Sequence, residues 1–409
     1  MKVLQINSVC GIGSTGRIAT DIDNILQSKG HDSYIAYGRD ALKPQENFLK
    51  IGNKLDFYLH ILKTRLFDLH GFGSRNATRG LLRKIDEIDP DIIHLHNIHG
   101  YYINIELLFN YLKKIKKPVI WTLHDCWSFT GHCSHFEYEG CECWRIDKNE
   151  KCIQKDSYPT SWFLNNSLSN FKRKQELFTG VENLTVVTPS NWLANLARQS
   201  LLKEYPVKTI NNGINLDIFK PTPSNLKESL AVENKFIILG VAGVWGEKKG
   251  LNHFVELSGK VSKDEAIILV GLTDAQIKSL PDNIIGIEKT NSIEELAQLY
   301  SMADVFVNPT LEDTFPTTNL EALACGTPVI TFQTGGSPET IDEKTGLVIE
   351  QENTGKLYEA ISKIKNGKLK LDAQDCVDRA RKHYNRSDKY QEYVDTYKQI
   401  IESKSKLYS

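Results

Sequence analysis

The sequence lacks several features that would assign it to a specialised class of protein. No sign of charge dominates, because 50 Lys and Arg residues balance 51 Asp and Glu residues to a formal net charge of -1. That balance argues against bulk nucleic-acid binding. We find no internal repeat, no low-complexity tract, and no apolar run near the roughly 20 residues needed to cross a bilayer. These absences leave an ordinary soluble globular protein.

The first residues also lack the pattern of a signal peptide. The stretch MKVLQINSVCGIGS alternates and soon meets glycines, which predicts a buried first strand. We therefore expect a cytoplasmic protein, whose eight cysteines are mostly reduced thiols or metal ligands rather than disulfides. A length of 409 residues exceeds one ordinary core, so two domains are expected.

Strand patterns alternate with helix patterns in both halves of the chain, which predicts two α/β domains with parallel sheets. The expected strands include 2–9, 32–38 and 91–96 in the first half, and 235–241, 265–271, 304–310 and 328–334 in the second. Turn residues and prolines over 205–225 predict the connection between the domains. The stretch 389–404 is predicted to form an amphipathic helix. Ligands of such sheets bind beyond the carboxyl ends of the strands.

One stretch after a predicted strand, DTFPTTNLEALACGTPVI (313–330), has the features of a phosphate site. Pro316 suits the first position of a helix, because proline loses no hydrogen bond there. Thr317 and Thr318 then fall in the first turn, where unpaired N–H groups and the helix dipole favour a phosphate.

The same stretch carries two acids that suit hydroxyl groups. An ionised carboxylate only accepts hydrogen bonds, so Asp313 and Glu321 fit sugar hydroxyls and repel phosphate. Phosphate and hydroxyl groups together describe a nucleotide-sugar. The alternative is a structural helix with an acidic start and one exposed Glu.

This stretch resembles the signature of family 4 retaining glycosyltransferases, which have the GT-B fold. The resemblance rests on an acid, seven residues, a Glu, ALACGTPVI and TGGSPE, and it covers most of the chain. It points to members that synthesise capsular polysaccharides and exopolysaccharides. It implies two doubly wound Rossmann-like domains that face each other across a cleft, with the last helix crossing back. We expect an acceptor-binding domain over 1–200, with 386–409 packed on it, and a nucleotide-sugar-binding domain over 201–385.

The resemblance implies roles for individual residues. Glu321 holds the ribose of the donor, Asp313 contacts the donor sugar, and nearby amides hold the pyrophosphate. The family usually has Glu where this chain has Asp313. The implied catalytic residues are His124, Lys249, Asp313 and Glu321. The implied donor-binding residues are Lys248, Thr314, Phe315, Pro316, Thr317, Thr318 and Glu321. No metal ion and no cofactor is expected at the diphosphate.

The loop GVWGEKKGL (243–251) is predicted to supply positive charge to the leaving diphosphate. Lys249 before Gly250 matches the family's lysine, and Val244 stands where the family usually has Arg. Lys248 is a candidate for the missing charge. The alternative is a solvated Lys-Lys pair at a helix start.

The loop GIGSTGR (11–17) places glycines after the first strand, where a ligand can approach the backbone closely. The spacing fits the G-x-G-x-x-G fingerprint of dinucleotide-binding sites. Such a site also has an acid after the second strand, but here the first acid is Asp40, which follows a Gly and an Arg and fits poorly. We therefore favour the role that the resemblance implies, which is a loop facing acceptor and donor phosphate. Its residues are Gly11, Gly13, Ser14, Gly16 and Arg17. A NAD(P)-dependent oxidoreductase remains an alternative.

Several histidines follow or lie in predicted strands of the first half. His124 follows a strand and resembles the family's active-site His, which hydrogen-bonds to the donor sugar. His94 and His96 share one strand face, so a zinc pair is conceivable, although a buried strand histidine is more often a satisfied core residue. His96 or Asn97 is assigned a minor role in the cleft.

Five cysteines and two histidines are close together in the sequence, which leaves three interpretations open. They are reduced structural thiols, a structural zinc site and a disulfide. The spacing lacks the paired C-x2-C pattern, so a structural zinc at Cys133 to Cys152 is considered without being adopted. The residues are Cys126, His132, Cys133, His135, Cys141, Cys143 and Cys152. Their aromatic neighbours are expected to pack a loop over the acceptor pocket.

The function implied by the resemblance is sugar transfer from a nucleotide-diphosphate sugar to a saccharide or lipid-linked saccharide in surface polysaccharide synthesis. Basic residues beside apolar ones in the stretch 62–84 are a candidate contact with the inner face of the plasma membrane, the alternative being a solvated face. A nucleotide-sugar epimerase of the same architecture and an inactive binding protein are also compatible with these motifs. The base, sugar, acceptor, linkage and oligomeric state are not specified by the sequence.

Overall fold

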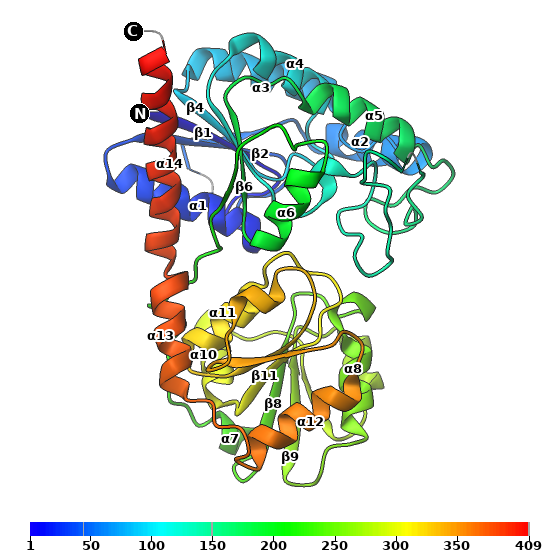
Figure 1. Cartoon of the computed structure of the whole chain (residues 1–409), viewed down its shortest axis with the longest axis vertical. Helices are drawn as coiled ribbons and strands as arrows, with labels where there is room; N and C mark the ends of the chain where they lie inside the picture. The colour runs from blue at the N-terminus through cyan, green and yellow to red at the C-terminus, as the bar shows by residue number, and fades with distance from the viewer. Residues whose placement is uncertain (44, 149, 408–409) are drawn as a thin grey trace. The chain divides into compact units, whose positions relative to one another are not determined.

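The structure is a computed structural model that describes residues 1–43, 45–148 and 150–407. It divides into two compact units, an N-terminal unit of Met1–Asn211 with the chain from Ser387 onward, and a C-terminal unit of Asn212–Arg386. Each unit is built on one parallel β-sheet with helices packed against it (Figure 1). Within the described residues, no helix is both long enough and apolar enough to cross a membrane.

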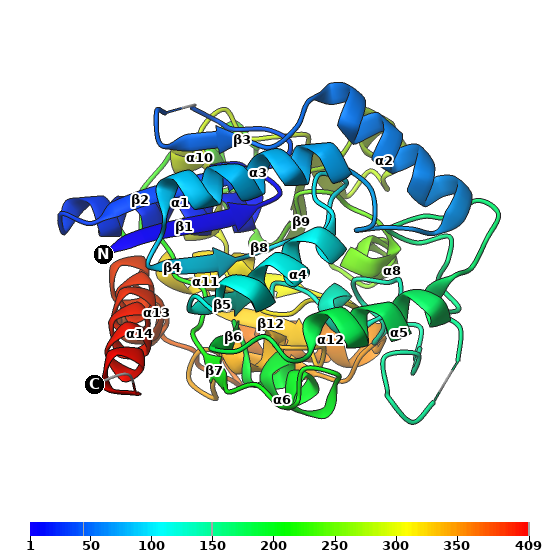
Figure 2. The ribbon, with the colours of Figure 1, turned by 90° about the horizontal axis from the view of Figure 1, so that it is seen from above.

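The N-terminal unit contains a seven-stranded sheet in the order β3-β2-β1-β4-β5-β6-β7. Figure 2 shows these strands from above, with α3 and α4 nearer the viewer. The order reverses between β1 and β4, the position at which open α/β sheets bind ligands. The strands are β1 (Lys2–Asn7), β2 (Asp32–Tyr37), β3 (Phe48–Lys50), β4 (Ile92–Leu95), β5 (Val119–Thr122), β6 (Leu184–Thr188) and β7 (Val207–Thr209).

Helices cover both faces of this sheet because alternate strand residues point to opposite sides. Leu4 and Ile6 of β1 pack in one apolar cluster, whereas Val3 packs in another. The helices are α1 (Gly13–Ser28), α2 (Lys54–Phe67), α3 (Arg75–Ile88), α4 (Ile105–Ile115), the short η1 (Trp127–Phe129), α5 (Ser167–Phe178), α6 (Asn191–Gln199) and α14 (Arg386–Leu407). Between η1 and α5, the described residues of 130–166 form neither helix nor strand.

The C-terminal helix α14 packs on the N-terminal unit, as the sequence predicted. Tyr390, Tyr393, Val394 and Tyr397 are buried in the cluster that contains Val3. Two of the tyrosine hydroxyls bond to the sheet, Tyr397 to His94 Nδ1 at 2.7 Å and Tyr393 to Thr122 Oγ1 at 3.3 Å. The apolar stripe of this helix is therefore an internal surface.

The C-terminal unit contains a six-stranded sheet in the order β10-β9-β8-β11-β12-β13, which reverses between β8 and β11. The strands are β8 (Phe236–Val241), β9 (Glu265–Val270), β10 (Ile284–Ile287), β11 (Val305–Asn308), β12 (Val329–Phe332) and β13 (Gly346–Ile349). Because β7 extends the first sheet to Thr209, the two units meet in the chain after Asn211, later than the expected boundary at residue 200.

The helices of this unit lie in the connections between strands, except α12 and α13, which follow the last strand. They are α7 (Leu226–Ser229), η2 (Glu247–Lys249), α8 (Leu251–Ser258), α9 (Asp274–Ser279), α10 (Ile293–Met302), α11 (Thr317–Ala324), η3 (Ser337–Thr340), α12 (Thr354–Lys365) and α13 (Ala373–Tyr384). The core of the unit includes Ile237 and Leu239 of β8 and Leu320 of α11. The connections after β8 and β11 therefore emerge at the switch point of the sheet, where the sequence placed its candidate residues.

Candidate functional site

Two loops of the C-terminal unit bring a lysine and an acid together at the switch point. Lys249 in η2 follows β8, and Asp313 follows the neighbouring strand β11. Lys249 Nζ lies 2.8 Å from Asp313 Oδ2 and 3.3 Å from the carbonyl oxygen of Glu312. The lysine side chain remains 40% exposed. The ammonium is therefore oriented by the acid and still accessible to a ligand.

A glycine allows these two loops to approach each other. Gly250 has a φ of +77°, and a Cβ at this position would lie 2.2 Å from the carbonyl oxygen of Pro309. Any larger residue would push the loops apart. The contact is secured by the amide of Leu311, which donates to the carbonyl oxygen of Lys248 at 2.9 Å. The G in the sequence KKG is thus required by the geometry of the site.

Lys248 pairs with an acid that the sequence did not single out. Its Nζ lies 2.9 Å from Glu312 Oε2, and the Glu312 side chain is only 5% exposed. A buried carboxylate needs a counter-ion, so Lys248 is held by Glu312. The position of Glu312 directly before Asp313 was the only signal in the sequence. Val244, at the position of the family's Arg, is exposed and contributes no charge.

Helix α11 begins one residue later than predicted, with Pro316 as the residue before its first turn. The proline thus caps the helix, and Thr317 opens it. The N–H groups of Thr317 and Thr318 precede the first internal hydrogen bonds of a helix. The Phe315 side chain is buried in the core, and its amide donates to Asp313 Oδ1 at 3.1 Å. The Phe315 side chain is therefore unavailable to a ligand, whereas the first-turn amides of α11 are not used by hydrogen bonds within the helix.

Glu321 is buried, at 6% exposure, instead of standing on the helix surface. One of its oxygens accepts a hydrogen bond of 2.8 Å from the Tyr300 hydroxyl. Burial and the nearby Glu321 carboxylate raise the pKa of Tyr300 well above its ordinary value. The tyrosine therefore stays protonated and acts as a fixed donor that orients the carboxylate.

The loop after β12 completes this group of residues. The amide of Gly336 donates to the carbonyl oxygen of Asp313 at 3.2 Å. In the same loop, the hydroxyl oxygens of Thr334 and Ser337 are buried, and neither has a hydrogen-bond partner within the described residues. Thr314, beside Asp313, is also buried. The TGGSPE motif thus packs against the acid of the 313–330 stretch.

In the N-terminal unit, the predicted His124 pairs with His96 at the ends of β5 and β4. The ring nitrogens His96 Nδ1 and His124 Nε2 are 3.1 Å apart, and the rings stack at 5.4 Å. His96 Nε2 also bonds to Gln5 Oε1 at 3.0 Å. Burial lowers the pKa of His124 to about 4. His124 is therefore a neutral imidazole at physiological pH, suited to hydrogen bonding rather than to charge stabilisation.

His94 and His96 do not form a zinc pair. His94 lies between the Tyr397 hydroxyl at 2.7 Å and the Thr122 hydroxyl at 2.8 Å. Because both ring nitrogens have protein partners, His94 is a satisfied core histidine. The structure thus supports the simpler of the two interpretations of this pair.

A second group beside His124 was not anticipated from the sequence. His99 Nε2 lies 2.8 Å from Asp125 Oδ2, and His99 Nδ1 lies 3.2 Å from the Tyr158 hydroxyl. Burial alone would raise the pKa of Asp125, but the interaction with His99 lowers it to about 2. A small pocket is lined by residues of 96–99 and 121–128, including His124 and Asp125. The available signal was that Asp125 directly follows His124.

The glycine loop 11–17 forms the turn between β1 and the start of α1. Gly11 and Gly13 have φ values of +70° and +63°, and a Cβ on Gly16 would lie 3.1 Å from the amide nitrogen of Gly11. That amide already donates to the carbonyl oxygen of Gly16. Ser14 and Arg17 are exposed at the first turn of the helix. The exposed first-turn groups, rather than the Gly11 amide, are thus the ligand-accessible part of this loop.

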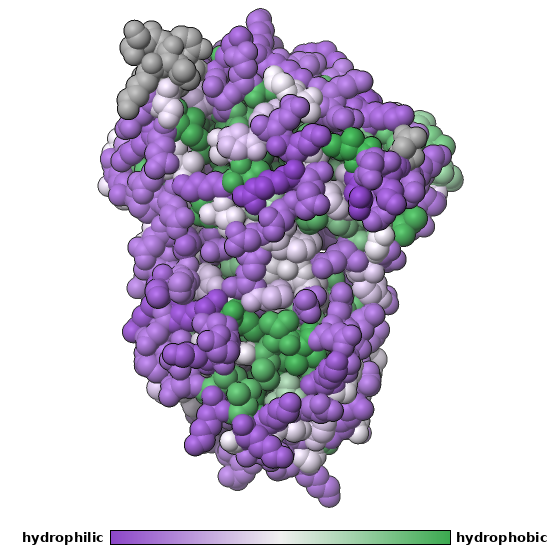
Figure 3. Space-filling model, viewed as in Figure 1, coloured by the Kyte–Doolittle hydropathy of each residue, from purple (hydrophilic) through white to green (hydrophobic). Residues whose placement is uncertain are grey.

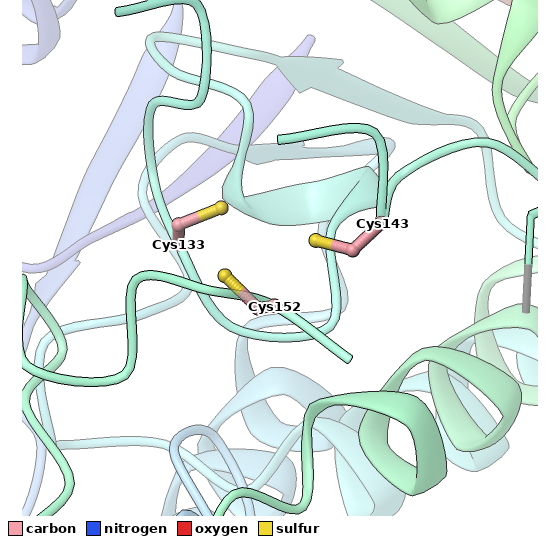
Figure 4. A group of neighbouring side chains, drawn as sticks. All are labelled: Cys133, Cys143 and Cys152. Atoms are coloured by element: carbon pink, nitrogen blue, oxygen red, sulfur yellow. The ribbon is translucent and has the colours of Figure 1, made fainter. Parts of the chain in front are cut away.

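The cysteine-rich segment separates into a compact group of four cysteines and three other residues, Cys126, His132 and His135; the carbonyl oxygen of His135 accepts from Gln154 Nε2 at 3.0 Å. Cys141 Sγ lies 3.1 Å from Cys143 Sγ and 3.9 Å from Cys152 Sγ. The sulfur atoms of Cys133, Cys143 and Cys152 lie within 4.8 Å of one another (Figure 4). His132 instead contacts Asp68, with His132 Nδ1 2.5 Å from Asp68 Oδ1. The backbone amide of Cys126 bonds to the carbonyl oxygen of Ser134.

Both halves of the chain match family models of glycosyltransferases. The model described as Glycosyltransferase Family 4 matches residues 15–218, and the model described as Glycosyl transferases group 1 matches residues 235–366. Neither an epimerase nor an oxidoreductase activity gains support from these matches.

Curated relatives and solved structures give the same result. The chain is 24% identical to the putative colanic acid biosynthesis glycosyl transferase WcaC of Escherichia coli, over 98% of this chain and 100% of the relative. It is 30% identical to the N,N'-diacetylbacillosaminyl-diphospho-undecaprenol alpha-1,3-N-acetylgalactosaminyltransferase of Campylobacter jejuni, over 51% of this chain and 59% of that protein. Anabaena HepE in complex with UDP has a TM-score of 0.68 at 16% identity, covering 98% of this chain and 100% of that one. The predicted GT-B fold is confirmed.

Proposed function

Because the chain belongs to the family 4 and group 1 glycosyltransferases, we propose that it moves a sugar from a nucleotide-diphosphate sugar to a saccharide or lipid-linked saccharide, with retention of anomeric configuration. The observation that carries this proposal is the Lys249–Asp313 pair of 2.8 Å, four residues ahead of the α11 N-terminus. A cation and free amides at one place suit a diphosphate. A relative named for colanic acid biosynthesis supports a role in surface polysaccharide synthesis.

Each residue of the C-terminal unit receives a separate task. Lys249 and the amides of Thr317 and Thr318 neutralise the diphosphate as the bond to the sugar breaks. Asp313 accepts hydrogen bonds from the donor sugar while it orients Lys249. Glu321, fixed by Tyr300, accepts hydrogen bonds from the ribose. The donor sugar and the ribose both present hydroxyl groups, and an ionised carboxylate provides the hydrogen-bond acceptors that these hydroxyl groups need.

The N-terminal unit is assigned to the acceptor and to one hydrogen bond with the sugar. His124 is neutral and held by His96, so it can donate or accept a hydrogen bond without adding charge. No protein nucleophile is required, since the leaving phosphate itself takes the acceptor proton in this class of mechanism. The glycine loop with Ser14 and Arg17 is assigned to phosphate or acceptor contacts.

Donor binding tests the proposal directly. We expect thermal stabilisation by one nucleotide-diphosphate sugar from a panel of UDP-, GDP- and ADP-sugars, and none by NAD(P), because a ligand of the folded state raises the melting temperature. Glu321→Gln keeps an acceptor for Tyr300 but removes the charge. This change should weaken donor binding by about 10- to 100-fold, the worth of one hydrogen bond to a charged group.

The control for this change is Glu359→Gln, which alters an exposed glutamate of α12 and should bind the donor like the wild type. Titration calorimetry with the stabilising donor gives both affinities. Equal affinities for wild type and Glu321→Gln would remove Glu321 from the donor site. Stabilisation by NAD(P) alone would favour an oxidoreductase.

An exposed apolar surface on the N-terminal unit supports a lipid-linked acceptor. Helix α2 reverses the usual pattern of burial, because the residues it buries are the polar His60 and Thr64. Its outward face is apolar and is formed by Leu55, Tyr58, Leu59, Leu62 and Phe67. Relatives include proteins named for a diphospho-undecaprenol substrate and for synthesis of a diacylglycerol glycolipid.

The chain before α5 extends this surface. Trp162 and Phe163 are 56% and 70% exposed, and the amide of Trp162 donates to the carbonyl oxygen of Arg65 at 2.7 Å. Figure 3 shows hydrophobic side chains gathered at this edge of the unit. Lys54, Lys63 and Arg65 outnumber the single acid of α2. Exposed aromatic side chains with basic neighbours fit the interface of an anionic membrane.

Within the stretch 62–84, we place the membrane contact on the end of α2, which includes Leu62 and Phe67, rather than on the whole stretch. Phe72 is buried, with the Arg173 guanidinium 3.7 Å from the centre of its ring. Arg75 and Lys84 form ion pairs with Glu106 and Glu87. Helix α3 is thus an ordinary solvated face, and the apolar contact belongs to α2 and the chain at 162–164.

We expect the protein to co-sediment with vesicles that contain anionic phospholipid, and to do so less at high salt because charges are then screened. The double change Trp162→Ser with Phe163→Ser should weaken vesicle binding by about tenfold or more, since each side chain contributes on the order of 1.5 kcal/mol when buried in lipid. The matched control is Leu42→Ser, which changes an exposed apolar residue of this unit outside the proposed surface. Unchanged sedimentation of the double variant would exclude this surface.

A further inference from the structure

Four buried cysteines form a site that sugar transfer does not use. Cys133, Cys141, Cys143 and Cys152 are free thiols, all buried. In Figure 4 the side chains of Cys133, Cys143 and Cys152 point toward a common centre. Cys141 joins them through its sulfur contacts of 3.1 Å with Cys143 and 3.9 Å with Cys152.

The distances between these sulfur atoms match a single tetrahedral ion. Zinc–thiolate bonds are about 2.3 Å long, so the sulfur atoms of a tetrahedral site lie about 3.8 Å apart. The observed sulfur–sulfur distances of 3.1 and 3.9 Å, and the limit of 4.8 Å among Cys133, Cys143 and Cys152, surround that value. We propose that Cys133, Cys141, Cys143 and Cys152 bind one structural zinc ion as a tetrathiolate site.

The surroundings of the four sulfur atoms suit a charged metal site shielded from water. Zinc with four thiolates carries a net charge of -2, and the fully buried side chain of Lys174 is linked to this group of cysteines through Thr130. Lys174 Nζ donates to the carbonyl oxygen of Thr130, and the Thr130 hydroxyl donates to the carbonyl oxygen of Cys133. On the apolar side, Phe136 and Trp144 stack at 5.2 Å. Buried lysines are rare unless paired, and the proposed ion gives this one a counter-charge.

The lack of regular structure in this segment is a second reason to expect a cross-link. Residues 130–166 form neither helix nor strand where they are described, and connections of this length without secondary structure are uncommon in compact domains. One ion bound to four positions between 133 and 152 would stabilise the folded segment, because the unfolded chain has no preformed site for it. The segment carries Tyr158, whose hydroxyl contacts His99, so the ion would help to hold that tyrosine against His99.

A disulfide and an iron–sulfur cluster fit the geometry of these thiols less well. A disulfide has a sulfur–sulfur distance of about 2.05 Å and joins two thiols, which leaves two more buried beside it. An iron–sulfur cluster places several metal and sulfide atoms between its thiolates, which separates them further than one ion does. A mononuclear site is the arrangement that brings all four of these neighbouring thiols to one ion.

The experiment measures metal in the purified full-length protein, expressed without a metal-affinity tag. We expect about one zinc per chain by plasma mass spectrometry, and X-ray absorption at the zinc edge should show four sulfur neighbours at about 2.3 Å. Cys133→Ser and Cys143→Ser should each lose most of the zinc. Cys126→Ser, a buried cysteine of the same segment outside the group, should retain it.

The wild-type protein alone decides the matter if the variants fail to fold, because its metal content and sulfur coordination need no substitution. Reduced protein with four titratable thiols at these positions and no metal would overturn the proposal, as would iron in place of zinc. A disulfide among these residues in intact-mass and peptide analysis would overturn it too. None of these results depends on the donor or on transferase activity, so the test stands apart from the proposed function.

Discussion

Lys249→Met should lower kcat by about 100- to 1,000-fold, the usual effect of removing one group that stabilises charge in a transition state. The donor KM should change far less, because the negative charge on the leaving diphosphate grows only as the bond to the sugar breaks. Lys249 is placed for this role by Asp313, which lies 2.8 Å from its ammonium group. Methionine keeps most of the length of the side chain and removes the ammonium group with its charge and its N–H donors.

The neighbouring lysine provides the sharpest comparison. Lys248 pairs with the buried Glu312, so its loss leaves a buried carboxylate without a counter-ion. Lys248→Met should therefore lower the melting temperature while kcat falls by less than about tenfold, because no transition-state contact is removed. Lys356→Met, at an exposed lysine paired with Glu350, should change neither quantity. Of these two adjacent lysines, Lys249 is thus expected to affect mainly kcat and Lys248 mainly the melting temperature.

The acceptor need not be known for this measurement. Slow cleavage of the donor with water as acceptor releases nucleoside diphosphate, and its single-turnover rate reports on the same leaving group. Lys249→Arg keeps the charge and should recover part of the rate. A wild-type cleavage rate in Lys249→Met would show that the leaving diphosphate is stabilised elsewhere, and the assignment of η2 would fail.

The parts of this site that follow one local rule were predictable from sequence. The start of α11 within one residue of Pro316, and the turn at Gly250, follow from backbone chemistry that a proline or a glycine dictates. The placement of Lys249 near Asp313 followed from a resemblance and from two strands that proved to be neighbours. For the proline and the glycine, the information lies within a few residues of the feature.

The parts that depend on distant partners could not be predicted in this way. Glu312 pairs with Lys248 across two loops, and Tyr158 reaches His99 from a segment without regular structure. In helix α2, the polar His60 proved to be an inward residue, and its ring accepts hydrogen bonds from the amides of Gly71 and Gly73. Such pairings are set by tertiary packing, which periodicity in one segment cannot reveal.

The same buried histidines predict a strong dependence of stability on pH. Burial is the main cause that lowers the pKa of His60 to about 3, of His124 to about 4, and of His70, His94 and His96 well below the ordinary value. The folded protein therefore keeps these rings neutral, whereas the unfolded chain protonates them below its pKa of about 6.5. Stability is complete above pH 6.5 and is lost as the pH falls toward 4, because the unfolded state binds more protons.

The expected size of this effect is large. Each of the five histidines contributes up to about 2 kcal/mol of destabilisation at pH 5, and whole domains are stable by only about 5–15 kcal/mol. All five belong to the N-terminal unit. Asp125, whose pKa of about 2 reflects its His99 partner against the opposing effect of burial, acts in the same direction at still lower pH. We therefore expect this unit to unfold first on acidification.

Calorimetry between pH 7.5 and pH 5 should resolve two transitions, of which the N-terminal one moves to lower temperature while the C-terminal one moves little. Tryptophan fluorescence identifies the first, because five of the six tryptophans precede residue 212. His60→Gln keeps an acceptor for the two glycine amides and should reduce proton uptake on unfolding by about one. His383→Gln, at an exposed histidine of the C-terminal unit, should leave that slope unchanged. A first transition that stays at one temperature from pH 7.5 to pH 5 would mean that these rings are already solvated or charged in the folded protein.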